Sequence, residues 1–333
     1  MVLTAVLLGL FAASIDLREV WAAITRAHPS LIVAAVGVTM VTYVLRAVRW
    51  RFLLRPLGPV RLSIAFRTTV IGFAATFLLP GRVGEVLRPL LLARHERLKA
   101  TSTFATVIVE RLLDLCTVVF LFVVAIWFSQ ADVGRDVRIA GLIAAGVSVV
   151  ALGVLFACAG HPERLGRWAH ALTRPLPAVI ASRAGAFVQT FAEGLGVLRS
   201  PGHLALAIAW SLPLWLSIAV GIWLTSWAFD LTVPFVGSFL VVGYLAVGVA
   251  APTPGGAGGF HYLYLLALTG LFGADPDVAG AAALVLHAVS FVPVTILGVV
   301  FMWQDGLTLG RLRGLQAENA GTGAPADSGG PLR

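Results

Sequence analysis

Long apolar runs constrain the fold of this chain more than any other feature. Six of them, each bounded by charges or turn residues, approach the ~20 residues that a helix needs to cross a bilayer. They lie near residues 1–15, 29–48, 104–129, 139–159, 203–228 and 278–303. Only 12% of the 333 residues are charged, about half the share in an ordinary soluble domain. The sequence therefore predicts an all-α, polytopic membrane protein.

Two further apolar regions are interrupted by proline and glycine. Residues 62–93 form two arms around Pro80 and Gly81, and residues 235–273 form two arms around the sequence PTPGGAGG at 252–259. Interrupted apolar segments in corresponding positions of two halves indicate the inverted repeat of a transporter-like protein. We expect two re-entrant hairpins whose tips face each other near the bilayer midplane, and six to eight spans in total.

The distribution of positive charge predicts the orientation. Four connections hold 17 Arg or Lys residues, and the alternate connections hold only 4. The rich connections are 46–67, 94–99, 160–202 and the tail from 304; the poor ones are 16–28, 130–138, 229–234 and 274–277. Because cytoplasmic loops are enriched in Arg and Lys, we expect a multi-pass protein of the plasma (inner) membrane with both termini cytoplasmic.

The domain organisation follows from the same pattern. Residues 1–303 are expected to form a single integral membrane domain that begins with an uncleaved first span. Segment 160–202 has helical apolar spacing and is expected at the cytoplasmic interface, with a soluble connector as the alternative. The tail 304–333 is rich in Gly, Ala and Pro and is expected to be a disordered cytoplasmic segment.

The first interrupted region carries charges where a bilayer is most apolar. Arg82, Glu85 and Arg88 are spaced by three, so that a helix would place them on one face. If exposed to lipid, the three charges would cost about 8–10 kcal/mol, so we expect them to face protein or a wet cavity. Free N–H groups after the break also favour an anion. A phosphate between Arg82 and Arg88 is the prediction; an interfacial loop with ordinary headgroup-facing arginines is the alternative.

A second group of charges lies in the following apolar run. In VIVERLLDL, Glu110 and Asp114 are four residues apart on one helix face, and Arg111 lies beside them. The two carboxylates are positioned to neutralise Arg82 and Arg88 across the bundle, or to take up a proton during transport. A purely structural ion-pair network is the alternative.

The second interrupted region has glycines instead of charges. Gly255 and Gly256 allow close approach of the backbone to a ligand or to another helix. His261 follows the tip, and His287 lies in the last apolar run; each alone fits a satisfied buried histidine, and together they are candidates for a polar contact with substrate. The sequence shows no metal-ligand spacing or nucleotide-binding loop and no nucleic-acid-binding module. No metal, cofactor or nucleic acid is expected.

The segments that carry these features resemble the lysylphosphatidylglycerol synthase transmembrane family, a flippase-like membrane module. The resemblance rests on RAVRWRFLLRPLG at 46–58, LLPGRVGEVLRPLLLAR at 78–94, TVIVERLLDL at 106–115 and APTPGGAGGFHYLYLLAL at 251–268. The family's PGG-x-G-x-x-E pattern is changed here, because His261 stands where a glutamate is usual.

The resemblance implies lipid translocation or handling. The expected ligand is the anionic or phosphate-bearing headgroup of a membrane phospholipid or polyprenyl-phosphate lipid. The chain has no room for the soluble aminoacyl-transfer domain of full-length synthases, so we expect that it is not an enzyme. Two alternatives stay open: an integral-membrane enzyme or enzyme subunit of lipid or polyprenyl-lipid modification, with Glu110 or Asp114 as base, and a non-catalytic membrane assembly partner.

Overall fold

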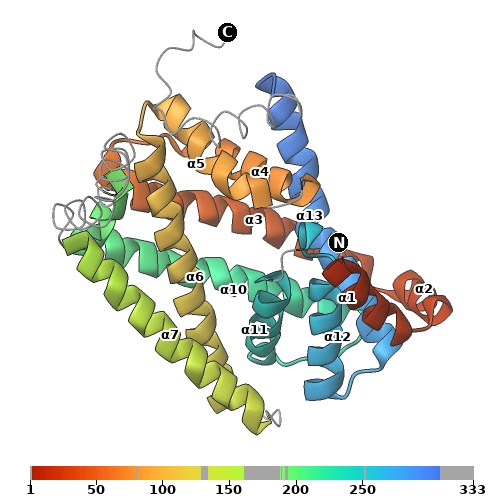
Figure 1. Cartoon of the computed structure of the whole chain (residues 1–333). Coiled ribbons are helices and arrows are strands. Elements are labelled where there is room, and N and C mark those ends of the chain that lie inside the picture. The colour runs from red at the N-terminus through yellow and green to blue at the C-terminus, as the bar shows by residue number, and fades with distance from the viewer. Residues whose placement is uncertain are drawn as a thin grey trace.

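The computed structural model describes residues 2–79, 82–128, 134–160, 188, 190–191, 194–250 and 253–307. These residues form a bundle of eleven α-helices and contain no strand (Figure 1). The long helices are α3 (Pro29–Leu54), α6 (Ala100–Phe128), α7 (Arg135–Gly160), α10 (Pro201–Ala228) and α13 (Pro276–Gln304). Of these, α3, α10 and α13 are long and apolar enough to cross a membrane. The prediction of an all-α, polytopic membrane protein is confirmed.

The two interrupted regions form helical hairpins. The first consists of α4 (Leu62–Leu78) and α5 (Val83–Glu96), and the second of α11 (Gly237–Ala250) and α12 (Gly259–Phe272). With 17, 14, 14 and 14 residues, their arms are about 21–26 Å long at 1.5 Å per residue. That is less than the ~30 Å of a bilayer core, and it fits re-entrant hairpins. Of the expected tips, Pro80 and Gly81 of the first and Pro252 of the second lie outside the described residues.

A pair of glycines allows the two arms of each hairpin to come into backbone contact. A Cβ atom at Gly84 on α5 would overlap the carbonyl oxygen of Gly72 on α4. In the second hairpin, a Cβ atom at Gly248 on α11 would lie 2.6 Å from the carbonyl oxygen of Gly259 on α12. Both positions therefore require glycine, because any side chain would push the two backbones apart.

The residues that flank the two breaks lie against one another. Arg82, just before α5, donates a hydrogen bond to the carbonyl oxygen of Val249 near the end of α11. The short 3-10 helix η4 (Pro254–Gly256) contacts α4, and its Gly255 lies beside the backbone of Phe77. Helix α13 packs against both α4 and α12. The breaks of the two hairpins are far apart in the sequence, but they lie side by side in the bundle.

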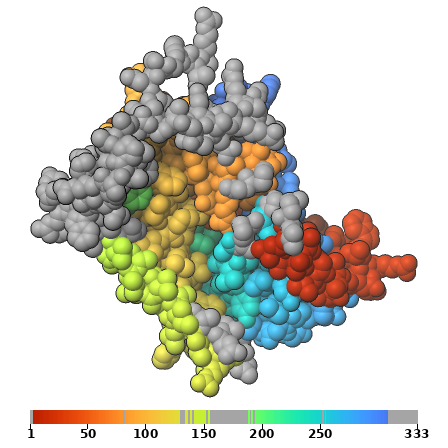
Figure 2. Space-filling model, in the orientation of Figure 1, coloured from red at the N-terminus to blue at the C-terminus, as the bar shows by residue number. Residues whose placement is uncertain are grey.

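The remaining helices pack around the hairpins. Helices α3 and α10 lie side by side along their lengths, and α6 packs across both (Figure 1). Helices α1 (Val2–Ala13) and α2 (Leu17–Arg26) project at one edge of the molecule, where α1 contacts α12 and α2 contacts α13 (Figure 2). The largest cluster of buried apolar residues joins these helices to α6, α10 and α11.

Several boundaries differ from the sequence prediction. Helix α2 occupies part of the expected connection 16–28, where the Asp16 side chain caps it by accepting from the backbone N–H of Arg18 at 2.7 Å. Helix α1 has 12 residues, about 18 Å, and is shorter than the span expected over 1–15. Helix α3 continues to Leu54, well past the expected end at residue 48. Most of segment 160–202 and the tail from residue 308 lie outside the described residues.

Candidate functional site

The first element of the site is an ion pair between α5 and α6. Arg88 donates from Nη1 and Nη2 to the two carboxylate oxygens of Glu110, at 2.8 and 3.2 Å. The guanidinium of Arg88 also lies 3.8 Å from the centre of the Trp50 ring, a cation–π geometry. Trp50 is itself fixed, because its indole N–H donates to Thr106 at 3.0 Å. Arg88 is therefore held from three helices at once: α5, α6 and α3.

A second ion pair lies one helical turn further along α6. Arg49 of α3 donates from Nη1 to Asp114 at 2.6 Å, and its Nη2 lies 3.6 Å from Glu110. Two residues of α10 complete this pair: Trp215 donates its indole N–H to Asp114 at 2.9 Å, and Ser211 accepts from Arg49 at 3.2 Å. The side chains of both members of the pair are buried.

Two more arginines adjoin the same carboxylates. Arg111 donates to Glu110 at 2.9 Å and lies 3.6 Å from Asp114. Its side chain is 41% exposed, which makes it the open edge of the group. Arg46, one turn before Arg49 on α3, lies over the ring of Phe73 at 5.1 Å and interacts electrostatically with Asp114. Among the described residues, no carboxylate lies within ion-pair distance of Arg46.

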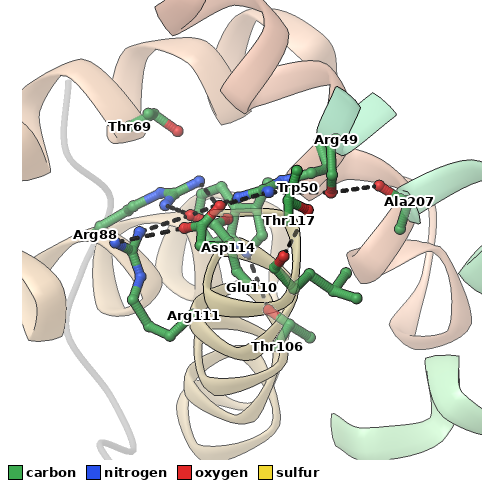
Figure 3. A network of polar contacts seen from close by, with 12 residues as sticks. Arg49, Trp50, Thr69, Arg88, Thr106, Glu110, Arg111, Asp114, Thr117 and Ala207 are labelled. Atoms are coloured by element: carbon green, nitrogen blue, oxygen red, sulfur yellow. Dashed lines mark hydrogen bonds and ion pairs between the residues drawn. The ribbon is translucent and has the colours of Figure 1, made fainter. Parts of the chain in front are cut away.

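We call this group the buried charge cluster. It consists of Arg46, Arg49, Arg88, Arg111, Glu110 and Asp114. Figure 3 shows most of these side chains converging beside α6. Glu110 is ten residues beyond the start of α6, about 15 Å along the helix. Several nitrogens in the cluster are buried without a hydrogen-bond partner: Nη1 of Arg46, Nε and Nη2 of Arg49, and Nε of Arg88.

The predicted trio in the first hairpin divides into two parts. Arg88 joins the buried charge cluster, whereas Arg82 pairs with Glu85 at 3.5 Å and has a side chain that is 39% exposed. Arg82 has left-handed backbone geometry (φ 54°) and precedes α5, so it is not on a continuous helical face with Arg88. The two arginines therefore have different ion-pair partners, Glu85 for Arg82 and Glu110 for Arg88. The partner carboxylate of Arg88 is Glu110 of α6, as the pairing of the two charged segments predicted, whereas Arg82 pairs with Glu85 of its own segment.

The two predicted histidines, His261 of the second hairpin and His287 of α13, lie against each other. The rings of His261 and His287 lie 4.5 Å apart between centroids, with Phe260 against both. His287 Nε2 lies 2.9 Å from the carbonyl oxygen of Gly255, so that the tautomer with a proton on Nε2 donates to it. Neither histidine contacts the buried charge cluster through any ion pair or hydrogen bond of the described residues. Gly256, like Gly255, has a positive φ and forms the turn.

The side chain of His261 caps the start of α12. It is the third residue of α12, and its Nδ1 accepts from the backbone N–H of Gly258, the residue before the helix, at 3.4 Å. A glutamate or glutamine at this position of a helix makes the same return contact in a capping box. The ring nitrogen of His261 therefore accepts the hydrogen bond that a glutamate side chain would accept at the start of α12.

Sequence reasoning missed Arg46 and Arg49 as site residues. Both were placed in a cytoplasmic connection because positive charge at the end of an apolar run is typical of a loop. The spacing of three between them, followed by the apolar residue Trp50, was the available signal of a continuing helix. A separate open cavity of about 370 Å³ lies beyond the end of α3; its lining residues are Arg51, Arg55, Pro59, Val60, Arg61 and Glu96.

Comparison with known proteins gives three relatives. Glycosyltransferase AglD of Haloferax volcanii is 30% identical over 90% of this chain, and the match covers 53% of AglD. The chain thus spans about half the length of that protein. Two proteins of Methanothermobacter thermautotrophicus, both named UPF0104 membrane protein, are 26% identical over 84% and 81% of this chain, with 87% and 82% of their own lengths covered.

The match to AglD overturns one expectation. The absence of an aminoacyl-transfer domain led us to expect that the chain is not an enzyme. That expectation is contradicted by a relative that is named a glycosyltransferase and is similar over most of this chain.

The family assignment rests on a match over most of the chain. Residues 1–298 match the family described as the lysylphosphatidylglycerol synthase TM region, so that the match includes both hairpins and all six residues of the buried charge cluster. The resemblance carried by the four sequence segments is thereby confirmed: the chain is a multi-pass membrane protein that belongs to the lysylphosphatidylglycerol synthase TM region family.

Proposed function

We propose that the buried charge cluster binds the phosphate group of a membrane lipid, and that the protein moves this headgroup between leaflets or presents it for reaction. The observation that carries the proposal is the composition of the cluster: four arginines adjoin only two carboxylates. Arginine binds phosphate through its planar set of N–H donors. The lipid is a phospholipid or a polyprenyl phosphate, of the plasma membrane, and both termini are cytoplasmic.

The arginines of the cluster would contribute to phosphate binding in different ways. Arg88 and Arg49 are anchored by Glu110 and Asp114, so that their remaining N–H groups have fixed directions. Arg111 is the partly exposed member and marks the side from which a headgroup reaches the cluster. Inside a low-dielectric bundle, each of these contacts is stronger than in water. Glu110 and Asp114 hold the arginines in place and need no further role.

A second function is favoured by the glycosyltransferase relative. In this alternative, the chain acts as an enzyme or enzyme subunit of lipid modification, and the cluster presents a lipid phosphate to a sugar-transfer reaction. The name of AglD supports this alternative. The same phosphate site serves both functions, so that binding is the first property to test.

Arg46 offers the sharpest test of binding. It lacks an ion-pair partner among the described residues, and the substitution Arg46→Met strands no carboxylate. If the cluster were only structural, removing the partly buried, unpaired charge of Arg46 would leave stability equal or higher and lipid binding unchanged. If the cluster binds phosphate, the variant should fold normally and lose on the order of tenfold or more in lipid affinity.

The experiment compares purified wild type, Arg46→Met and the control Arg94→Met, which removes an exposed arginine near the end of α5. Native mass spectrometry measures retention of phosphatidic acid and phosphatidylglycerol, and vesicles that contain a fluorescent analogue of each lipid report its movement between leaflets. Thermal unfolding of the same samples establishes folding. Equal lipid retention by folded Arg46→Met and wild type would refute the phosphate site.

A further inference from the structure

We infer that the open cavity beyond the end of α3 is an anion site of its own, which binds a phosphate ester at the surface of the membrane. Six residues line this cavity: Arg51, Arg55, Pro59, Val60, Arg61 and Glu96. None of them belongs to the buried charge cluster. The inference therefore does not depend on the function proposed for that cluster.

The cavity lies at the open end of the first hairpin. Its lining residues come from the last turn of α3, from η1 (Arg55–Leu57) and the connection to α4, and from the last residue of α5. Helix α3 has 26 residues, about 39 Å at 1.5 Å per residue. This length exceeds the ~30 Å of a bilayer core, so that the end of α3 is at the depth of the lipid headgroups.

Positive charge dominates the lining of the cavity. Three arginines against one glutamate leave a net charge of +2. Arg51 and Arg55 are exposed, and neither forms an ion pair with a carboxylate among the described residues. Arginine binds phosphate through its planar set of N–H donors. The charge and the residue type therefore favour a phosphate-bearing ligand.

One side of the cavity is held in place by an ion pair between the two arms of the hairpin. Arg61, the residue before α4, donates from its backbone N–H and from Nε to Oε1 of Glu96, at 3.3 and 3.2 Å. The Glu96 side chain is only 10% exposed. Pro59, with its fixed φ, and the buried Val60 form the apolar part of the lining. This part of the wall is ordered before a ligand binds, which favours affinity.

The size of the cavity indicates the class of ligand. Its volume of about 370 Å³ is within the range of about 300–1,000 Å³ for small-molecule sites, and it exceeds what a bare phosphate ion needs. A phosphate ester with a small organic group, such as glycerol phosphate, fits both the size and the charge. The same group occurs in the lipid phosphatidic acid and in soluble glycerol 3-phosphate, so that the test must separate these two sources.

The test places a reporter in the wall of the cavity. Pro59→Cys is introduced into the full-length protein after both native cysteines are replaced by serine, and the protein is held in nanodiscs of neutral phosphatidylcholine. The rate of reaction with N-ethylmaleimide, an uncharged thiol reagent, is measured without ligand, with glycerol 3-phosphate, and with phosphatidic acid in the nanodisc. At ten times its dissociation constant, a ligand should slow the reaction about tenfold, because only free sites react. The control reporter is Thr25→Cys on α2, an exposed position outside the cavity.

The charge contribution is tested in the Pro59→Cys protein. Arg51→Gln and Arg55→Gln should each weaken binding on the order of tenfold, as expected for loss of a hydrogen-bonded charge. The control Arg94→Gln removes an exposed arginine of α5 that does not line the cavity, and it should leave the slowing unchanged. Thermal unfolding of each variant establishes that it is folded.

Each outcome decides the inference. Slowing by glycerol 3-phosphate would identify a site for soluble esters, and slowing by phosphatidic acid alone would identify a site for a lipid headgroup; either result supports the anion site. Slowing by neither ligand, slowing that Arg51→Gln and Arg55→Gln do not reduce, or equal slowing at Thr25→Cys would overturn it. The two arginines would then only interact with the terminal carbonyls of α3. Because the reporter lies in the cavity, none of these results depends on binding at the buried charge cluster.

Discussion

Arg88 and Glu110 form a two-bond ion pair, at 2.8 and 3.2 Å, in which the side chains are 3% and 0% exposed. The pair links the first hairpin to α6 and is the point where the two charged sequence segments meet. Because neither group is exposed, Arg88 depends on Glu110 for compensation of its charge, whereas Glu110 is also paired with Arg111 and Arg49.

Removal of the carboxylate charge should therefore destabilise the protein strongly. Glu110→Gln leaves Arg88, Arg49 and Arg111 with a single remaining carboxylate, and we expect a loss of about 3–5 kcal/mol of folding free energy. Thermal unfolding in detergent, followed by tryptophan fluorescence, measures the change. The control is Glu96→Gln, which breaks the pair with Arg61, whose side chain is exposed; we expect a loss of at most about 1 kcal/mol. Equal losses for both variants would contradict this account.

The glycine contacts within the hairpins give a second prediction. Gly84→Ala should lower the melting temperature sharply or prevent folding, because the added Cβ overlaps the Gly72 carbonyl oxygen. Gly37→Ala on α3 is the matched control, since nothing lies within 4 Å of its added Cβ. In a helix interior, this control change should stabilise by about 0.5–1 kcal/mol. A Gly84→Ala protein as stable as wild type would show that the arms of this hairpin are not in backbone contact.

The role of His261 at the start of α12 gives a third prediction. His261→Gln keeps an acceptor for the backbone N–H of Gly258, and a glutamine suits this capping position. His261→Ala leaves that buried N–H unpaired, which costs about 1–3 kcal/mol. We expect the melting temperature of the alanine variant to fall below that of the glutamine variant. If both fall equally, the loss comes from packing of the ring against His287 and not from the cap.

The expected orientation is tested by cysteine labelling. After both native cysteines are replaced by serine, Thr25→Cys should react with an impermeant thiol reagent added outside intact cells. Pro59→Cys, in the arginine-rich connection, should react only after the membrane is permeabilised. Both positions are exposed, so that a difference in reaction reports the side of the membrane. External labelling of Pro59→Cys alone would reverse the orientation.

The sequence predicted the helices well, because bilayer-spanning apolar runs are visible without knowledge of packing. The six runs and the four hairpin arms each correspond to a helix of the structure. The short helix α2 was missed although its signal was present: Asp16, followed three residues later by Glu19, is a typical start of a helix. With ten residues, α2 is too short to be recognised as a membrane span, and it was included in the connection 16–28.

The site was predicted less completely, since its composition depends on where α3 ends. Arg46 and Arg49 belong to the cluster only because the helix continues past them, and that continuation depends on the tertiary burial of Trp50, Leu53 and Leu54. A prediction of loops from charge alone does not take this tertiary packing into account. The left-handed backbone geometry at Arg82 likewise places this residue before α5, a feature that an assumed regular helix does not contain.

The glycine contacts also determine how the hairpins can move. Backbone against backbone, the two arms of a hairpin cannot splay or slide without losing the packing at Gly72–Gly84 or at Gly248–Gly259. Each hairpin therefore moves as one rigid unit. The hydrogen bond from Arg82 to Val249 and the contact of η4 with α4 both connect the first hairpin to the second, so that a displacement of one hairpin is transmitted to the other.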